Sequence, residues 1–179
     1  MDWDALRRIV THDENGRSRI LIDGAAAKLF AVEETGLAEI WSAGLSADKI
    51  LDASDQLSIE DVRLEPAPGA VKVRWFTVAP EADGRTREEK ESQAAMAFSA
   101  IGAEHCRIDT EKHPAMHKTD SLDVIVLVRG EVELVLDDAG ATALKPGDVV
   151  IQRATNHAWV NKTAETALLV AILMNGTTS

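Results

Sequence analysis

The chain contains no tyrosine and a single cysteine, Cys106. Without tyrosine, no phenol can serve as an acid or base. With one cysteine, neither an internal disulfide nor a cysteine-rich zinc site can form. A lone cysteine is typical of a reducing compartment, and we expect a cytoplasmic location. The chain also lacks any apolar run approaching the roughly eighteen residues of a membrane span, and its charged first residues are unlike a signal peptide.

Positive charge is scarce as well, because 19 Lys and Arg stand against 30 Asp and Glu, which gives a net charge of −11. An acidic surface repels nucleic-acid phosphates and anionic membranes, so we expect neither as a partner and a small molecule as the ligand. A chain of 179 residues can form one domain, with or without an arm, around a core that needs no disulfide.

The first 65 residues are weakly patterned. Residues 7–11 and 18–23 are strand candidates on either side of a polar turn that contains His12. Residues 29–32 and 38–41 are further strand candidates, and residues 46–55 read as a helical turn or a loop. We predict that residues 1–65 form an arm of short strands packing on a main domain at 66–179.

The break Pro-Ala-Pro-Gly at 66–69 opens the main domain. Residues 71–79 alternate between apolar and charged side chains and then become apolar on both faces, which predicts a strand covered on both sides. Residues 85–102 predict a helical insertion that starts with acids and stops at Gly102, and that packs on the sheet or covers a pocket mouth. From residue 124 short strands recur about every ten residues, a pattern typical of an antiparallel sandwich or barrel.

Three of the five histidines fall between His113 and Asn161. On one extended strand, His117 and Asp123 would lie about 20 Å apart. A bend at 118–122 would bring them onto neighbouring strands, and His157 would join them from a third. Two imidazoles and one carboxylate suit Fe(II), Mn(II), Zn(II) or Ni(II). The alternative from spacing alone is that each His caps a strand end and bonds only to backbone.

This stretch resembles the cupin superfamily. Asp123 and Gly130 stand at the spacing of the acid and glycine that end the family's first motif, with Asp in place of the usual Glu. Gly147, His157 and Asn161 resemble the second motif, where Arg153 and Thr155 stand for the usual Pro and Gly. The resemblance implies an all-β fold, the cupin double-stranded β-helix or jelly-roll barrel, with an N-terminal strand arm and one or two short helices.

The resemblance also implies one divalent transition metal ion, with His117, Asp123 and His157 as ligands. Thr119 falls where the family's second His would stand, so His113 or a water completes the set. Asp120 and His113 are candidate catalytic residues. Thr119, Trp159 and Asn161 are candidate pocket residues, although Trp159 as core packing and Asn161 as a tie for the following turn are open alternatives.

Three functions follow as hypotheses. The first is a metal-dependent lyase, decarboxylase, dehydratase or isomerase that acts on a small organic acid or carbonyl compound through a metal-stabilised enolate. Its proton donor would be a metal-bound water or one of the side chains of His113, Asp120, Glu104 and Lys118. The second is an Fe(II)-dependent dioxygenase. The third is a metal-containing barrel that binds a small molecule without turnover. A homodimer is expected because barrel edges need covering.

Overall fold

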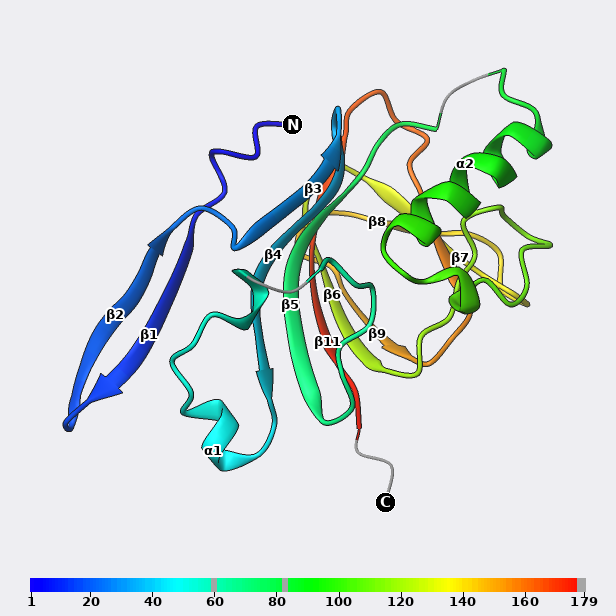
Figure 1. Cartoon of the computed structure of the whole chain (residues 1–179). Helices are drawn as coiled ribbons and strands as arrows, with labels where there is room; N and C mark the ends of the chain where they lie inside the picture. Colours follow the sequence, from blue (N-terminus) through cyan, green and yellow to red (C-terminus); the bar gives the residue numbers. More distant parts are fainter. Residues whose placement is uncertain (59–60, 82–83, 177–179) are drawn as a thin grey trace.

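Two antiparallel sheets enclose the core of the molecule. The computed structural model describes residues 1–58, 61–81 and 84–176. One sheet has six strands in the order β3-β4-β5-β11-β6-β9, and the other has three in the order β10-β7-β8 (Figure 1). The strands are β1 (Arg8–Glu14), β2 (Arg17–Gly24), β3 (Lys28–Val32), β4 (Thr35–Gly44), β5 (Ala70–Val78), β6 (Leu122–Arg129), β7 (Val132–Leu136), β8 (Thr142–Leu144), β9 (Val149–Arg153), β10 (His157–Val160) and β11 (Ala167–Met174).

The main hydrophobic core lies between these sheets. Ile125 and Leu127 of β6 and Leu169 of β11 face Leu134 of β7 and Leu144 of β8, and all five are buried. The all-β prediction is confirmed, and so are the strands expected from residue 71 onward. Their alternating apolar residues fill the space between the sheets, and removal of this apolar surface from water is the main force that holds them together.

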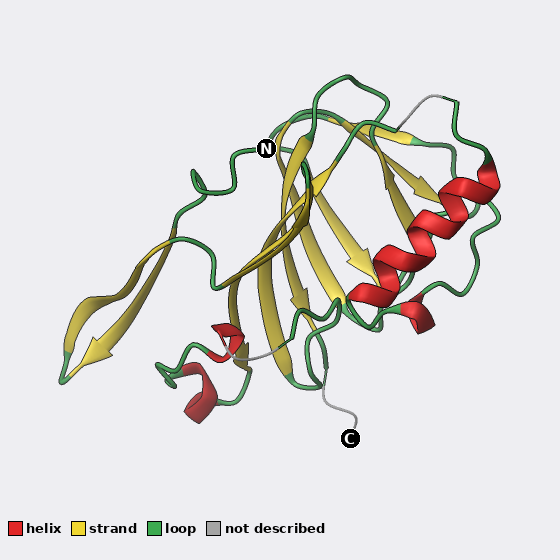
Figure 2. Ribbon diagram, turned by 45° about the horizontal axis from the view of Figure 1, so that its top comes forward, coloured by secondary structure: helices red, strands yellow, loops and turns green. Residues whose placement is uncertain are grey.

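The N-terminal segment contributes two separate structures. Strands β3 and β4 extend the six-stranded sheet, whereas β1 and β2 pair only with each other in a hairpin that projects from the rest of the chain (Figures 1 and 2). The division at residue 65 stays a prediction, and so does a homodimer. Among the described residues, no helix is long and apolar enough to span a membrane.

The predicted turn around His12 is wrong in its extent. His12 lies inside β1 and pairs with Arg19 of β2. Asn15 and Gly16 alone have left-handed backbone, with φ of 56° and 77°, as a two-residue hairpin turn requires. Because this turn needs only two residues, the polar residues before it continue the strand.

Among the residues that the structure describes, two helices and two 3-10 turns connect the strands: α1 (Ala47–Ile50), α2 (Arg87–Ala100), η1 (Gln56–Ser58) and η2 (Glu104–Cys106). A capping box starts α2, where Thr86 accepts a hydrogen bond from the Glu89 backbone and Glu89 accepts one in return. The helix lies alongside the strands (Figure 2) and has no fully buried residue. Its Phe98 ring lies 4.7 Å from the ring of His117. The helix therefore contributes a wall to the space around that histidine.

In the bend between β9 and β10, Ala154 has a left-handed backbone conformation, with φ of 51°. Thr155, which the sequence resemblance places at the usual glycine position, is the next residue. A left-handed conformation costs a residue with a Cβ about 1–2 kcal/mol. The bend thus stores strain immediately before His157.

Candidate metal centre

His117 and His157 face each other on paired segments. The His117 backbone N donates to the His157 carbonyl at 2.9 Å, and the His157 N donates to the His117 carbonyl at 3.0 Å. This is an antiparallel bridge, and the ring centroids lie 4.2 Å apart. Backbone hydrogen bonding, rather than the side chains, therefore brings the two imidazoles together.

The protonation of both rings is set by nearby backbone. Nδ1 of His117 lies 3.0 Å from the Ala115 carbonyl, and Nδ1 of His157 lies 2.9 Å from the Thr155 carbonyl. A carbonyl only accepts, so each Nδ1 carries the proton and each Nε2 keeps its lone pair. Burial lowers the pKa of His117 to about 4 and that of His157 to about 3, so both rings are neutral at pH 7. Neutral imidazoles with a free Nε2 are metal ligands.

Asp123 is the second residue of β6 and is only 4% exposed. The Ser121 hydroxyl donates to Oδ1 at 2.6 Å, and the Thr119 hydroxyl donates to Oδ2 at 3.4 Å. Burial raises the pKa of Asp123, while these two hydroxyls and Arg74 act in the opposite direction. The two oxygens retain further lone pairs that a cation could use.

Arg74 of β5 is a site residue that the sequence patterns did not single out. It is 1% exposed, and its Nη2 lies 2.9 Å from Oε1 of Glu39 on β4. Within the described parts of the chain, its Nε and Nη1 have no hydrogen-bond partner. Burial without a partner is costly for such donors, which suits them to bind an oxygen ligand.

Gln152 of β9 is the second residue that sequence reasoning missed. It is 3% exposed and lies opposite Asp123 in the β6–β9 ladder. Its Nε2 has no hydrogen-bond partner among the residues described. Three unpartnered donor atoms, two of Arg74 and one of Gln152, therefore belong to side chains that line the same cavity as Asp123.

These side chains line one cavity of about 180 Å³. Most of its wall is apolar, which separates the polar groups from bulk water and strengthens interactions between charges. The lining residues are Leu37, Leu64, Arg74, Phe76, Phe98, Ile101, His117, Thr119, Asp123, Ile125, Gln152, His157, Trp159, Ala171 and Leu173.

His113 and Asp120 do not line this cavity. Nε2 of His113 lies 3.0 Å from Oε1 of Glu81, and its Nδ1 accepts a hydrogen bond from the Ala115 backbone. Asp120 is exposed. The geometry therefore gives neither residue a position next to His117 and His157, and we leave both out of the proposed site.

The three predicted pocket residues separate into two groups. Thr119 and Trp159 line the cavity, and the Trp159 ring lies 5.7 Å from that of His157. Asn161 lies outside it. Its Nδ2 donates to the carbonyls of Val78 and Glu165, and its Oδ1 accepts from Thr163. Asn161 thus ties the turn after β10 to β5, which was the alternative open from the sequence.

Comparison with known proteins places this geometry in context. No family model matches the chain. A Cupin 2 conserved barrel domain protein from Salinispora arenicola is similar in structure, with a TM-score of 0.42 and 16% identity over 83% of this chain and 82% of that one. A protein from Photorhabdus luminescens has a TM-score of 0.43 and 11% identity over 83% and 81%.

Sequence similarity to curated proteins is higher but local. Phomopsin biosynthesis cluster protein C' of Diaporthe leptostromiformis is 51% identical over 47 residues, 26% of this chain and 25% of that protein. The cupin-domain-containing oxidoreductase fogC of Aspergillus ruber is 40% identical over 53 residues, 30% and 26% of the two chains. Over about fifty residues, this chain is therefore similar to cupin-domain-containing proteins. Its match spans about a quarter of the length of these curated relatives.

The donor set of this cavity fits a divalent transition metal. Two neutral imidazoles lie side by side, and a buried carboxylate lines the same cavity. Their ligand atoms, however, are not all within 4.8 Å of one another. Within the described residues, this close spacing is found for Glu65, His105 and Cys106. Binding at His117, His157 and Asp123 would therefore require these side chains to move closer together.

Proposed function

We propose that this protein is a metal-dependent enzyme that acts on a small organic acid. The observation that carries the proposal is that the His117–His157 pair and the unpartnered donors of Arg74 line the same cavity. His117, His157 and Asp123 would hold the ion, which can be iron, zinc, manganese or nickel. When bound, such an ion supplies Lewis-acid charge to the substrate oxygens.

Arg74 would bind the substrate carboxylate. A guanidinium presents planar N–H groups that match the two oxygens of a carboxylate. Nη2 is occupied by Glu39, whereas Nε and Nη1 have no hydrogen-bond partner in the described chain. Gln152 Nε2 would donate a further hydrogen bond to a substrate oxygen.

Charge balance supports an anionic substrate. Arg74 offsets the charge of Glu39, and Asp123 adds a second carboxylate nearby. A divalent cation would leave the group of three with a net charge of +1, which one substrate carboxylate neutralises. Burial makes this balance important because charge is poorly screened away from water.

The cavity sets the size of the substrate. Its volume of about 180 Å³ is below the range of roughly 300–1,000 Å³ that is common for drug-sized ligands. Phe76, Phe98 and Trp159 provide aromatic walls around the polar groups. These walls favour a compact acid with an apolar portion and exclude bulk water from it.

Among lyase-type reactions, decarboxylation fits the described cavity best. Apart from Arg74, the titratable side chains in its lining are the proposed ligands His117, Asp123 and His157. Dehydration and isomerisation need a positioned acid or base, whereas the carbon left by loss of CO₂ can take its proton from water. The proposal is therefore a metal-dependent decarboxylase of a small acid.

An Fe(II)-dependent dioxygenase is the second candidate. Two imidazoles and a carboxylate leave ligand positions for both oxygen and substrate. Two relatives favour it, since fogC of Aspergillus ruber and srdD of Neurospora crassa are cupin-domain-containing oxidoreductases. The same Arg74 contact would orient the acid in either reaction.

Turnover with and without oxygen separates these candidates. The protein is loaded with Fe(II), Mn(II), Zn(II) or Ni(II) and supplied with a panel of small 2-oxo, 3-oxo and hydroxy acids. CO₂ release under nitrogen supports the decarboxylase, and oxygen uptake that requires Fe(II) supports the dioxygenase. Binding without product in either atmosphere would leave a non-catalytic binding protein.

The Arg74→Lys variant tests the substrate class in the same assay. It retains a positive charge against Glu39 but loses the planar pair of donors. We expect KM for the acid to rise by about tenfold or more while metal content is unchanged. The corresponding amide of the acid is the matched control, and a variant that discriminates acid from amide as well as the wild type does would contradict the role of Arg74.

A further inference from the structure

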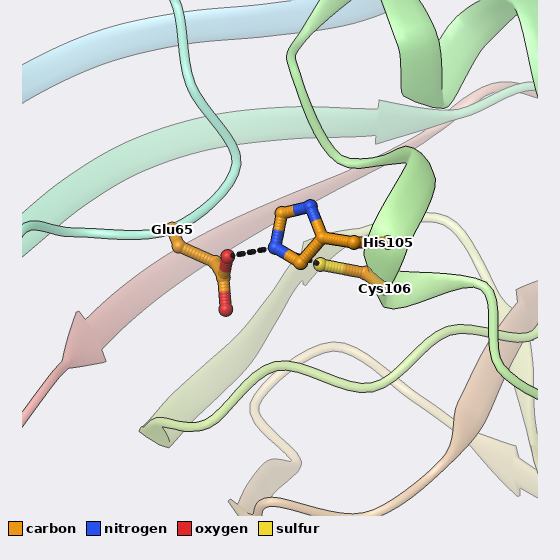
Figure 3. A group of neighbouring side chains, drawn as sticks. All are labelled: Glu65, His105 and Cys106. Atoms are coloured by element: carbon orange, nitrogen blue, oxygen red, sulfur yellow. Dashed lines mark hydrogen bonds and ion pairs between the residues drawn. The ribbon is translucent and has the colours of Figure 1, made fainter.

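A second group of metal-ligating side chains lies outside the cavity of the proposed centre. Glu65 precedes β5, and His105 and Cys106 belong to η2 (Figure 3). Nε2 of His105 is 2.7 Å from Oε2 of Glu65 and 3.6 Å from Sγ of Cys106. All three ligand atoms lie within 4.8 Å of one another. Figure 3 shows the imidazole between the carboxylate and the thiol.

The backbone around these residues is fixed by hydrogen bonds. The Leu64 N donates to the Ile101 carbonyl, and the Lys118 N donates to the Cys106 carbonyl. Nζ of Lys72 donates to the Glu65 carbonyl. The two segments that carry the ligands are therefore held in position before any ion binds, which reduces the ordering cost of binding.

The spacing agrees with tetrahedral zinc. With metal–ligand distances near 2.3 Å to sulfur and near 2.0–2.1 Å to nitrogen and oxygen, a tetrahedron puts sulfur and nitrogen about 3.6 Å apart and nitrogen and oxygen about 3.3 Å apart. The observed separations are 3.6 Å and 2.7 Å. Replacing the Glu65–His105 hydrogen bond by an ion thus requires a shift of roughly half an ångström at a side chain.

The donors also select the type of metal. A thiolate is a soft ligand and an imidazole suits zinc. Calcium and magnesium prefer oxygen ligands, and this set offers a single carboxylate. His105 is exposed, so an ion can enter from solvent and keep a water as its fourth ligand. Its side chain is 66% exposed, while that of Glu65 is 27% exposed.

We propose that Glu65, His105 and Cys106 form a second metal site in this protein, selective for Zn²⁺, independent of the centre at His117 and His157. The thiol proton must leave when the ion binds. The competing explanation is an exposed His–Glu ion pair beside a cysteine that only packs against Ile101 and Ala103. Such a pair would show no preference for thiophilic ions.

The position of the site suggests what it does. Leu64 adjoins Glu65, and both Leu64 and Ile101 line the central cavity. Cys106 packs in the same apolar cluster as Ile101. A zinc ion here would join the segment before β5 to η2 and so fix one wall of that cavity.

Cobalt spectroscopy on the full chain tests the site. Co²⁺ substitutes for Zn²⁺, and a thiolate ligand gives a charge-transfer band in the near ultraviolet. The chain has one cysteine, and His117, His157 and Asp123 contain no sulfur, so this band reports on Cys106 alone. In the H117A/H157A background, where this is the one proposed site left, we expect the band to saturate at one equivalent and added Zn²⁺ to abolish it.

Matched variants separate the two sites. The double variant H117A/H157A should keep the band, and C106S should lose it. H105A and E65Q, which alter more accessible side chains, should each weaken the apparent Zn²⁺ affinity by about tenfold or more, with unchanged circular dichroism. The proposal is overturned if the wild type gives no band in excess Co²⁺, or if both H105A and E65Q bind as the wild type does.

Discussion

The backbones of His117 and His157 exchange two hydrogen bonds, at 2.9 Å and 3.0 Å, across the antiparallel bridge between the segment of His117 and β10. This hydrogen-bonded pair places the two side chains opposite each other, with ring centroids 4.2 Å apart. A metal centre built on this pair depends on the backbone ladder, not on a flexible loop.

The burial of these two rings makes stability depend on pH in the metal-free protein. The pKa of His117 is lowered to about 4 and that of His157 to about 3, while unfolded histidine keeps a pKa near 6.5. Below pH 6.5 the unfolded state therefore binds more protons, and each histidine lowers the unfolding free energy by up to about 1.4 kcal/mol per pH unit. Asp123 acts in the opposite sense at acid pH, because its raised pKa lets the folded state take a proton first.

Urea unfolding with a chelator, at pH 7, 6 and 5, measures this dependence. The wild type should lose stability steadily over the range. The H117Q/H157Q variant should show a much flatter dependence, because its side chains do not titrate. Equal slopes for the two proteins would contradict the assignment of neutral, buried imidazoles.

Glu39 and Arg74 form an ion pair whose side chains are only 1% and 2% exposed. We expect E39Q to lower the unfolding free energy by about 3–5 kcal/mol, because it leaves the guanidinium buried without its counter-charge. The double variant E39M/R74M should cost far less, since it removes both charges. A double variant that is no more stable than E39Q would show that the pair itself is not what stabilises the fold here.

Thr119 lines the cavity beside Asp123 and stands where the family's second histidine would be. We expect T119H to raise metal affinity by about tenfold or more, because it adds a third imidazole to the ligand set. Competition titration against a chelator measures the change. The T119V variant is the control for loss of the hydroxyl. If the T119H variant binds metal no better than T119V, position 119 does not face the ion.

Ala154 holds a left-handed φ of 51° just before His157. A154G should stabilise the protein by about 0.5–1 kcal/mol, since relief of the Cβ clash exceeds the entropy that glycine adds to the unfolded chain. A158G, at a buried position in β10, should destabilise it. Urea midpoints of the two variants check the signs, and a destabilised A154G would refute the strain.

The sequence was most informative where one local pattern determines structure. Alternation predicts β6 to β11, and the motif spacing predicts that His117, Asp123 and His157 belong to one region. In the structure, all three line one cavity.

Arg74, Gln152 and Glu39 could not be found this way. A charged residue that alternates with valine normally faces solvent, yet Lys72 and Arg74 of β5 are buried, and both donate hydrogen bonds to the Arg63 carbonyl in the segment before β5. The pairing of Leu37 with Phe76, which adds β4 to the sheet, has no signal in short-range spacing. Likewise, His113 contacts Glu81 of a distant segment and does not line the cavity.

The most direct test of the metal centre is elemental analysis of protein purified without chelator. The wild type, the H117A/H157A variant and the H12A/H113A variant are compared, and C106S is included to subtract any ion held at Glu65, His105 and Cys106. We predict close to one equivalent of transition metal in C106S, which is retained when H12A/H113A is combined with C106S and lost when H117A/H157A is combined with C106S. Equal metal content in wild type and H117A/H157A, or none in either after supply of each ion, would contradict a metal centre at this histidine pair.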